Sequence, residues 1–380
     1  MLKVLFFIQG YEVPSARFRV LQYCDLFKQK GIESRVVACS PPFSSEPKYC
    51  RISLVYHFRN VLKALSYVKG LLAAEQYDVV FVQRELTLYS WTLFEKYLGR
   101  RHRPAFVFDF DDSIQLLYDN PDKAYGKIPK ILKAATLVIA GNSYLANYAQ
   151  QFQPNVCVLP TPVRVKQDTA GMDARLKRLR EYKLGAPYTI GWSGTRSNLP
   201  YLKLLAPAMS AIKEKYPFVR FHIMSNFETG KLPVLPFEYQ YTLWTAEHED
   251  EVIRSFDCGV MPLVDDNWTR GKCAFKLLLY MSHLVPSVAS PVGMNLEVIH
   301  PDSTGLLAGN EDEWFSCFER LIENPDLSAS LAANAFQQIK ANYTVDCCMS
   351  KLVEYLYEAV DLKQKNCRNM FGGEQLPLNK

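Results

Sequence analysis

The sequence predicts an α/β protein made of two doubly wound domains. Segments of strand character alternate with segments of helical character, and after a polar stretch near residue 170 the alternation starts again. With 380 residues, 48% of them hydrophobic and 22% charged, the chain is globular and long enough for two domains. Strands that alternate with helices indicate parallel sheets covered on both faces.

The first half contains six predicted strands, at residues 3–8, 34–39, 79–82, 105–110, 136–140 and 156–159. One helix is predicted over 17–30. A longer helix is predicted over about 52–76, because its apolar residues recur at helical spacing and form one stripe. This stripe consists of Ile52, Val55, Phe58, Leu62, Leu65, Val68 and Leu72. Two prolines, Pro160 and Pro162, then end the first half.

A polar segment, 164–182, is interpreted as the linker, with room for one surface helix. The second half has predicted strands at 189–192, 218–224, 239–243, 258–263 and 287–289. Helices are predicted over 199–216, 249–256, 274–283, 311–322, 327–339 and 345–362, before a polar tail at 366–380. The expected domains are 1–170 and 184–344.

Composition limits the cellular setting and the partners. The ten cysteines show no Cys-x-x-Cys spacing, which is typical of free thiols in a reducing compartment. No window approaches the ~20 apolar residues of a membrane span, so we expect a cytoplasmic protein. Residues 1–170 hold 22 Lys and Arg against 14 Asp and Glu, which hints at an anionic partner. Nucleic acid is the weaker candidate, because no binding motif for it is present.

An anionic membrane surface is another candidate partner for this basic half. The cations concerned lie in the stretch 96–103 and on the long helix: Lys96, Arg100, Arg101, Arg103, Arg51, Arg59, Lys63 and Lys69. Each such cation contributes about 1 kcal/mol near anionic lipid and is screened by salt. A solvated basic face is an equally good interpretation of the pattern.

Polar residues follow several strands of the first half. Gly10 precedes Arg17 and Arg19 on the incoming helix, without the Gly-x-Gly-x-x-Gly pattern of dinucleotide binders, so a dehydrogenase is unlikely to be the function. Arg84 and Glu85 follow the third strand. The fourth strand runs into Asp109-Phe110-Asp111-Asp112, where three carboxylates in four residues suggest contact with water, a cation or a substrate. A solvated helix start with an acidic first turn is the alternative.

The second half has two candidate anion sites. Its first strand runs into the glycine-containing turn Ser193-Gly194-Thr195-Arg196. A second turn, Thr269-Arg270-Gly271-Lys272, precedes the helix predicted over 274–283, and a helix N-terminus attracts anions. Lys272 and Lys276 are four residues apart and would share a helix face. An ordinary strand–helix connection with solvated lysines remains the alternative.

These motifs resemble those of family 4 (group 1) glycosyltransferases. The resemblance rests on 108–112, 191–195, 261–263, 271–278, 280–281, 286–293 and 305–307, and it extends over residues 1 to about 360. It implies the GT-B fold, in which two Rossmann-like domains face a cleft. In that fold the acceptor binds mainly the first domain, the nucleotide-sugar donor binds mainly the second, and the last helix, here 345–365, returns to the first. No metal or other cofactor is implied, because basic residues and helix N-termini neutralise the leaving diphosphate.

The resemblance also implies roles for individual residues. The donor diphosphate is assigned to Ser193, Gly194, Thr195, Arg196, Lys272 and Lys276. The region of the donor sugar and nucleotide is assigned to Trp244, Glu249, Asp265, Asp266, Asn295 and Glu297. Asp111 stands where many relatives have a cleft histidine, and it is the catalytic candidate together with Asp112. The acceptor side is assigned to Gly10, Arg17, Arg84 and Glu85.

The chain departs from the family at the ribose-binding glutamate, whose position is Leu279 here. Asp265 or Asp266 could replace it, or donor affinity could be low. Three functions therefore compete. The first is a sugar transferase that uses a nucleoside-diphosphate sugar, with retention, and acts on a glycan, lipid-linked or other acceptor. The second is a non-catalytic subunit that binds nucleotide or glycan, and the third is a GT-B sugar epimerase.

Overall fold

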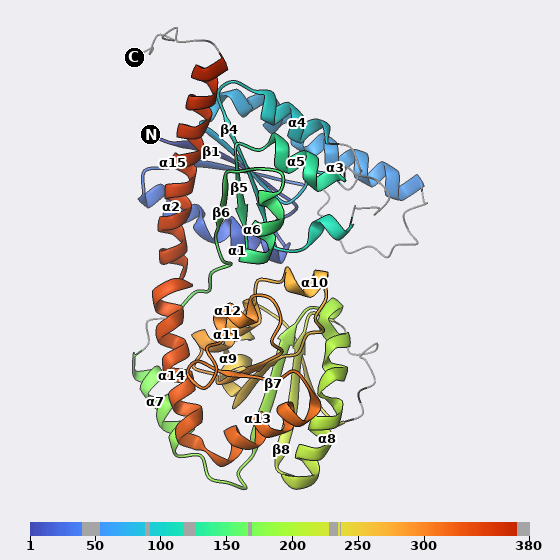
Figure 1. Cartoon of the computed structure of the whole chain (residues 1–380), viewed down its shortest axis with the longest axis vertical. Coiled ribbons are helices and arrows are strands. Elements are labelled where there is room, and N and C mark those ends of the chain that lie inside the picture. The colour runs from blue at the N-terminus through green and yellow to red at the C-terminus, as the bar shows by residue number, and fades with distance from the viewer. Residues whose placement is uncertain are drawn as a thin grey trace. The chain divides into compact units, whose positions relative to one another are not determined.

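The computed structural model describes residues 1–39, 54–87, 92–117, 126–165, 169–227, 235 and 237–370, with only the backbone at 54–60, 63, 169 and 370. The chain divides into two compact units. Unit 1 comprises Met1–Thr161 and Val345–Lys380, and unit 2 comprises Pro162–Thr344. Each unit is built around a six-stranded parallel sheet with helices on both faces (Figure 1), which confirms the predicted fold class.

The sheet of unit 1 has the strand order β2-β1-β3-β4-β5-β6. Its strands are β1 (Lys3–Ile8), β2 (Glu33–Ala38), β3 (Val79–Gln83), β4 (Ala105–Phe110), β5 (Leu137–Ala140) and β6 (Val156–Val158). The central strands β3 and β4 are almost entirely apolar, as expected for strands buried on both faces, with Gln83 and Asp109 as the exceptions. The chain order reverses between β1 and β3, and the loops after these two strands diverge there. Such a point is where open α/β sheets bind ligands.

Two sets of helices cover this sheet. The helical elements are α1 (Pro14–Arg19), η1 (Leu21–Tyr23), α2 (Cys24–Gln29), α3 (Leu54–Ala73), η3 (Ala74–Gln76), α4 (Leu93–Arg100), η4 (Ile114–Leu117), α5 (Lys127–Ala134), α6 (Ser143–Gln150) and α15 (Val345–Met370). Helices α3 to α6 share one core with one face of the sheet. Helices α1, α2 and α15 share the other core, in which Leu352 and Leu356 of α15 pack with Phe6.

Two helix predictions for unit 1 were wrong in detail. The helix expected over 17–30 is interrupted, because Val20 leaves helical geometry with φ −130°. On α3, the expected apolar stripe is not the face that packs on the sheet: Leu65 and Leu72 are 59% and 73% exposed. The packed face carries Tyr67, and Gly70 lets the Phe7 ring approach to 2.8 Å from where a Cβ would lie. Ile52 lies outside the described residues.

The sheet of unit 2 has the strand order β12-β11-β10-β7-β8-β9, which is the classical Rossmann order. Its strands are β7 (Tyr188–Gly194), β8 (Val219–Ser225), β9 (Gln240–Leu243), β10 (Cys258–Met261), β11 (Ser287–Ala289) and β12 (Leu306–Leu307). The chain order reverses between β7 and β10. The connections after these two strands diverge at their carboxyl ends, and a ligand is expected to bind in the crevice between them.

The helical elements of unit 2 are α7 (Thr169–Arg180), η5 (Arg196–Leu205), α8 (Ala206–Lys215), α9 (Glu249–Ser255), α10 (Asn267–Arg270), α11 (Phe275–Ser282), α12 (Asn295–Val298), α13 (Glu311–Glu323) and α14 (Pro325–Asn342). The helix predicted over 199–216 begins as the 3-10 segment η5, which contains Pro200. The strand predicted over 258–263 ends at Met261, because Pro262 has no amide hydrogen for the ladder. Among the described residues, no helix is long and apolar enough to cross a membrane.

Candidate active site

Strand β7 ends in a turn whose backbone is held by a tyrosine of α11. The Ser193 amide donates a 2.8 Å hydrogen bond to the hydroxyl of Tyr280, which is completely buried. An added Cβ at Gly191 would lie 2.0 Å from the Phe256 ring, so only glycine allows this ring to pack against the strand. The turn 193–196 therefore starts from a rigid strand end.

Lys276 reaches this turn from α11. A Cβ added at Gly194 would come within 2.6 Å of Lys276 Cε and 2.7 Å of Trp192 Cζ2. The Lys276 Nζ atom lies 5.7 Å from the centroid of the Trp192 ring, within the range of cation–π attraction. The structure thus brings together two predicted diphosphate residues that are far apart in sequence.

Helix α11 starts immediately after a strained residue. Ala274 has φ +49°, a left-handed conformation that is uncommon for a residue other than glycine. The helix begins at Phe275, and Lys276 is in its first turn. A lysine and the positive end of a helix dipole therefore contribute to the same candidate anion site.

Arg196 leaves the turn on the other side of β7. Its guanidinium carbon lies 4.2 Å from the centroid of Phe227, just beyond β8, and its amide donates a 3.3 Å hydrogen bond to Asn226 Oδ1. Lys276 comes instead from the connection between β10 and β11. The two cations flank β7, because β8 and β10 are its two neighbours in the sheet.

The predicted residues of the 265–272 segment make contacts within the segment itself. Asp265 pairs with Arg270 through hydrogen bonds of 2.6 and 2.9 Å. Asp266 caps α10 by accepting hydrogen bonds from the amides of Trp268 and Thr269 at 2.9 and 2.7 Å. Both aspartates therefore shape the loop that leads to Lys272, whose Nζ lies 5.7 Å from the Trp268 ring centroid. Their assignment to the ribose remains a prediction.

The remaining predicted donor residues lie at two other strand ends of the sheet. Trp244, which follows β9, donates a 2.7 Å hydrogen bond from Nε1 to Glu249 Oε1 at the start of α9. Asn295, which begins α12, is buried and donates to the Ser290 carbonyl at 2.9 Å. Glu297 lies exposed on α12. Trp244 and Glu249 form a pair, whereas the contacts of Asn295 indicate a role in the turn after β11.

Leu279, which the resemblance places at the family's ribose-binding glutamate, is 8% exposed. Its side chain belongs to the apolar core beneath α11. Its carbonyl accepts a hydrogen bond from the Ser282 hydroxyl at 2.8 Å. The side chain at this position thus contributes packing and offers no hydrogen-bond acceptor.

In unit 1, the predicted acidic residues follow β4 and meet the loop that follows β3. The Arg84 amide donates a 2.7 Å hydrogen bond to the Asp109 carbonyl, with Arg84 held at φ +61°. The Arg84 guanidinium lies 3.9 Å from the Asp112 carboxylate. Burial, and then the neighbouring Asp112 carboxylate, raise the pKa of Asp111 to about 6, while Arg84 acts in the opposite direction. Asp111 therefore titrates close to neutral pH.

The predicted acceptor residues at the switch point of unit 1 differ in exposure. Gly10 has φ +150° directly after β1. Arg17 places its guanidinium carbon 4.9 Å from the centroid of the Phe18 ring. Glu85 is only 2% exposed, and its carbonyl accepts a hydrogen bond from Gln9 Nε2 at 3.2 Å. Glu85 is thus buried just after β3, whereas Arg17 is partly exposed.

A buried ion pair that sequence analysis missed lies beneath this end of the strands. Arg19 is 3% exposed, and its Nε donates hydrogen bonds of 3.0 and 2.9 Å to the completely buried Asp109 carboxylate. Its Nη1 donates to the Leu159 carbonyl at 2.8 Å. Burial raises the pKa of Asp109, and the Arg19 charge opposes this shift. The signal in the sequence was present, since an aspartate within an apolar strand requires a partner.

A second buried ionic group lies behind Glu85. Glu95 of α4 is completely buried and accepts a 3.1 Å hydrogen bond from the Leu86 amide. Burial raises the pKa of Glu95, and Lys127 of α5 opposes the shift. Lys127 is 2% exposed and donates to the Thr87 carbonyl. These charges anchor the loop after β3, which carries Arg84.

We expect Arg19→Ala to lower the free energy of unfolding by about 3–5 kcal/mol, because it leaves the Asp109 carboxylate buried without a counter-ion. Urea denaturation measures this change. Arg17→Ala is the matched control on the same helix and should cost less than about 1 kcal/mol, since this arginine lies nearer the surface. If the two variants are equally stable, the buried pair does not support this edge of the sheet.

Among the described residues, no group of three His, Cys, Asp or Glu side chains is placed to hold a metal ion. This includes the acidic cluster after β4. There, Asp109 is paired with Arg19 and Asp112 lies near Arg84.

Comparison with known proteins adds the family. Residues 187–324 match the model of the group 1 glycosyl transferases, a range that contains the β7 turn, Lys272 and Lys276. None of the curated proteins matches the sequence significantly.

Solved structures resemble nearly the whole chain. Sucrose-phosphate synthase from Thermosynechococcus elongatus superposes with a TM-score of 0.68 at 11% identity, covering 94% of this chain and 99% of that one. The HepE protein of Anabaena, in complex with UDP and glucose, gives 0.63 at 14% identity, covering 94% and 100%. A glycosyltransferase from Rickettsia africae gives 0.64 at 13% identity, covering 94% and 99%.

These likenesses show the fold, and the family match shows the class of the second unit. All three structures span the two Rossmann-like units, so the predicted GT-B fold is confirmed. The chain carries a group 1 glycosyl transferase domain in unit 2 within a GT-B fold, and it is a glycosyltransferase.

Proposed function

We propose that this glycosyltransferase moves a sugar from a nucleoside-diphosphate sugar to a glycan, lipid-linked or other hydroxyl acceptor, with retention of the anomeric configuration. The observation that supports this most is the contact between Gly194 and Lys276 at the end of β7. It places a lysine and a helix N-terminus at the reversal point of a Rossmann sheet. Nucleotide phosphates bind at such points in this fold.

The diphosphate is assigned to the turn Ser193-Gly194-Thr195 and to three cations. Arg196 and Lys276 flank β7, and Lys272 lies on the loop that precedes α11. Negative charge grows on the diphosphate as the sugar leaves, and cations held in place stabilise it without reorganising. Trp244 and Glu249, which form a pair after β9, are assigned to the nucleotide base.

The acceptor is assigned to unit 1. Arg84 is fixed by the Asp109 carbonyl and lies near the Asp112 carboxylate, while Asp111 has a raised pKa. Shifted pKa values at the carboxyl ends of parallel strands mark functional carboxylates. We assign Asp111 the role of orienting the acceptor hydroxyl or stabilising positive charge on the reacting sugar.

A panel of nucleotide sugars tests the proposal directly. UDP-glucose is the first donor to test, since the HepE protein of Anabaena was solved in complex with it. We expect release of nucleoside diphosphate that depends on an acceptor, and NMR of the product should show the anomeric configuration of the donor. Release of nucleoside diphosphate from none of the donors, with glycan or lipid-phosphate acceptors present, would refute the transferase proposal. An inverted product would refute retention alone.

We propose, as a finer point, that unit 1 rests on anionic lipid while it takes its acceptor. Helix α3 exposes Leu65 and Leu72 at 59% and 73%, and α4 exposes Leu93 at 66%. Lys69 and Arg100 are exposed on the same two helices. Exposed apolar side chains among cations are the pattern by which amphipathic helices bind lipid interfaces.

The contacts of the other predicted cations limit this surface. Arg101 pairs with Glu75, and its guanidinium lies over the Tyr97 ring at 4.8 Å. Arg103 lies 3.5 Å from Asp78. Lys96 is exposed on α4. Arg51 lies outside the described residues, and of Arg59 and Lys63 only the backbone is described. The surface is therefore assigned to α3 and α4.

Flotation with vesicles tests the lipid surface. We expect the protein to float with phosphatidylserine-containing vesicles at low salt and to remain behind with neutral ones. Leu65→Glu combined with Leu72→Glu should abolish flotation, because both changes remove apolar contact and add repulsion from anionic lipid. Leu204→Glu, at an exposed leucine of unit 2, is the matched control. Failure of the wild-type protein to float at low salt would rule out this surface.

A further inference from the structure

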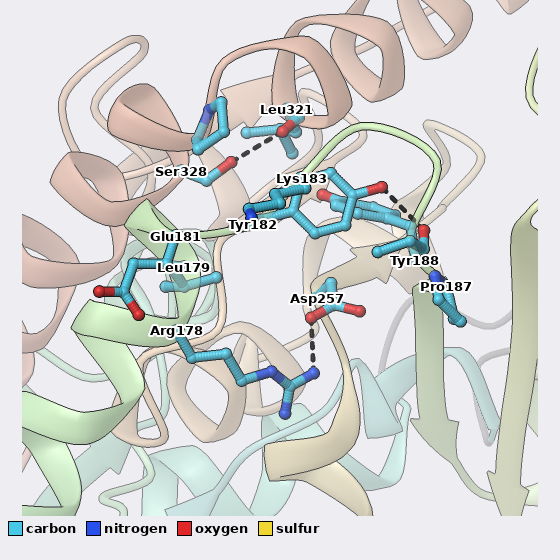
Figure 2. Close-up of a pocket in the computed structure, with 12 residues that line it drawn as sticks. Arg178, Leu179, Glu181, Tyr182, Lys183, Pro187, Tyr188, Asp257, Leu321 and Ser328 are labelled. Carbon is cyan, nitrogen blue, oxygen red and sulfur yellow. Dashed lines mark hydrogen bonds and ion pairs between the residues drawn. The ribbon is translucent and has the colours of Figure 1, made fainter.

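A pocket of about 450 Å³ lies at the amino-terminal ends of the strands of the second sheet (Figure 2). The diphosphate turn lies at their carboxyl ends. It contains Tyr188, the first residue of β7, and Asp257, which directly precedes β10. The diphosphate turn follows the other end of β7. Strand β7 has seven residues, so its two ends are roughly 20 Å apart. The pocket is therefore distinct from the donor site. Its volume falls in the range of small-molecule sites.

The floor of the pocket carries a buried hydroxyl group that has no partner in the structure. Tyr188 is 3% exposed, and its Oη makes no hydrogen bond. Its ring packs edge-on against Tyr182, with the ring centroids 5.3 Å apart. Burial raises the pKa of Tyr188 well above its ordinary value, so the phenol stays protonated and can donate. A buried hydroxyl group without a hydrogen-bond partner destabilises the folded protein. A ligand oxygen that accepts a hydrogen bond from it would remove this cost.

The wall of the pocket carries charge of both signs. Asp257 accepts hydrogen bonds from Arg178 Nη2 at 2.8 Å and from the Thr189 amide at 2.9 Å. A carboxylate has about four acceptor positions, so Asp257 retains room for a ligand hydroxyl. Arg178, Glu181 and Lys183 all line the pocket and are exposed. Arg178 is paired with Asp257, and Glu181 lies 3.8 Å from Lys177 outside the pocket. Figure 2 shows the carboxylate between Arg178 and the two tyrosines.

A single class of ligand matches these groups. The Lys183 ammonium suits a phosphate group, which accepts charge-assisted hydrogen bonds. The Asp257 carboxylate and the Tyr188 hydroxyl suit sugar hydroxyl groups, which both donate and accept. The Tyr182 ring provides an apolar face for the carbon skeleton. A nucleotide is less well matched, because the second aromatic ring, Tyr188, is already packed against Tyr182.

We propose that this pocket is a second ligand site, which binds a small phosphorylated sugar at the amino-terminal ends of the strands of the second sheet. The proposal is independent of the donor and acceptor assignments, because it concerns binding at the other end of β7. The site is formed by the linker helix α7, the loop that follows it, the start of β7, the residue before β10, and residues of α13 and α14. A ligand there would hold the linker against the sheet.

Calorimetric titration with glucose 6-phosphate, in the presence of saturating UDP, tests the proposal on the full chain. UDP occupies the donor site and prevents phosphate from binding there. We expect binding by the wild-type protein. Lys183→Ala should weaken it at least tenfold and Tyr188→Phe about fivefold, as expected for loss of a charge-assisted and a neutral hydrogen bond. Arg180→Ala, at an exposed arginine of α7 outside the pocket, should bind as the wild type does.

Several results would overturn the proposal. One is the absence of glucose 6-phosphate binding at millimolar concentration under these conditions. Another is equal binding by Lys183→Ala, Tyr188→Phe and the wild type, which would place the ligand elsewhere. Inorganic phosphate that binds as tightly as glucose 6-phosphate would show that the sugar is not recognised. UDP titrations of the same variants should match the wild type, and that agreement separates this site from a failure of the donor site.

Discussion

Alanine at Lys276 or at Arg196 should weaken the binding of a nucleoside diphosphate at least tenfold. Each cation is expected to donate charge-assisted hydrogen bonds to the diphosphate, which contribute about 1.5–3 kcal/mol apiece. A loss of about 1.4 kcal/mol already corresponds to a factor of ten. Calorimetric titration with UDP measures the change. The two effects should be of similar size, because the cations lie on opposite sides of β7.

The structure also provides a matched control for each variant. Lys203→Ala removes an exposed lysine of η5, and Arg220→Ala removes an exposed arginine near the start of β8. Both should leave UDP affinity unchanged. Lys276 additionally packs against Trp192 and Gly194, so Lys276→Met, which keeps most of the apolar stem, separates the loss of charge from the loss of packing. Unchanged UDP affinity in both alanine variants would exclude this turn as the diphosphate site.

Asp111→Asn should lower turnover about 100-fold or more while leaving nucleotide affinity nearly unchanged. Removing a single group that stabilises transition-state charge typically has an effect of this size. The substitution preserves the shape of the side chain but removes its negative charge. UDP affinity should be preserved because the diphosphate is assigned to other residues, whereas Asp111 is assigned to the acceptor hydroxyl or the reacting sugar, and UDP contains neither. Steady-state kinetics combined with UDP titration measures both quantities.

The pH dependence gives a second measure of the same residue. Because burial raises the pKa of Asp111 to about 6, the carboxylate predominates above pH 6 and is neutralised below it. Turnover that needs the carboxylate should therefore fall as the pH drops through about 6, and Asp111→Asn should lose this limb of the profile. Asp25→Asn, at an exposed aspartate of α2, is the control. Wild-type turnover by Asp111→Asn would reassign the role to Asp112 or exclude this cluster from catalysis.

Local sequence pattern was sufficient to predict the parallel architecture. Strand β11 was predicted at its observed bounds, Ser287–Ala289, because a buried strand of a parallel sheet is a short apolar run closed by turn residues. The glycine turn after β7 was found for the same reason. Its strand, Tyr188–Gly194, contains the large apolar residues Ile190 and Trp192 and runs directly into a glycine-containing turn. The sequence predicted which segments form strands, and therefore which residues lie at strand ends.

Amphipathicity alone did not determine which face of a helix packs. On α3, Leu65 and Leu72 point outward while Tyr67 is buried, because Gly70 leaves space for Phe7 and only the sheet offers that complementary shape. The pairing of Arg19 with Asp109 joins two elements far apart in sequence, and no periodicity encodes it.

The sequence by itself determined the alternation of elements, the fold class and the polar residues at the strand ends. The tertiary structure alone decided which of these residues meet. In the folded protein Lys276 packs against Gly194, Asp265 pairs with Arg270, and Asp266 caps α10. The Tyr188 hydroxyl group is buried without a hydrogen-bond partner. The physical reason is that strand and helix character depend on neighbours along the chain, whereas the environment of a charge depends on groups that only folding brings near.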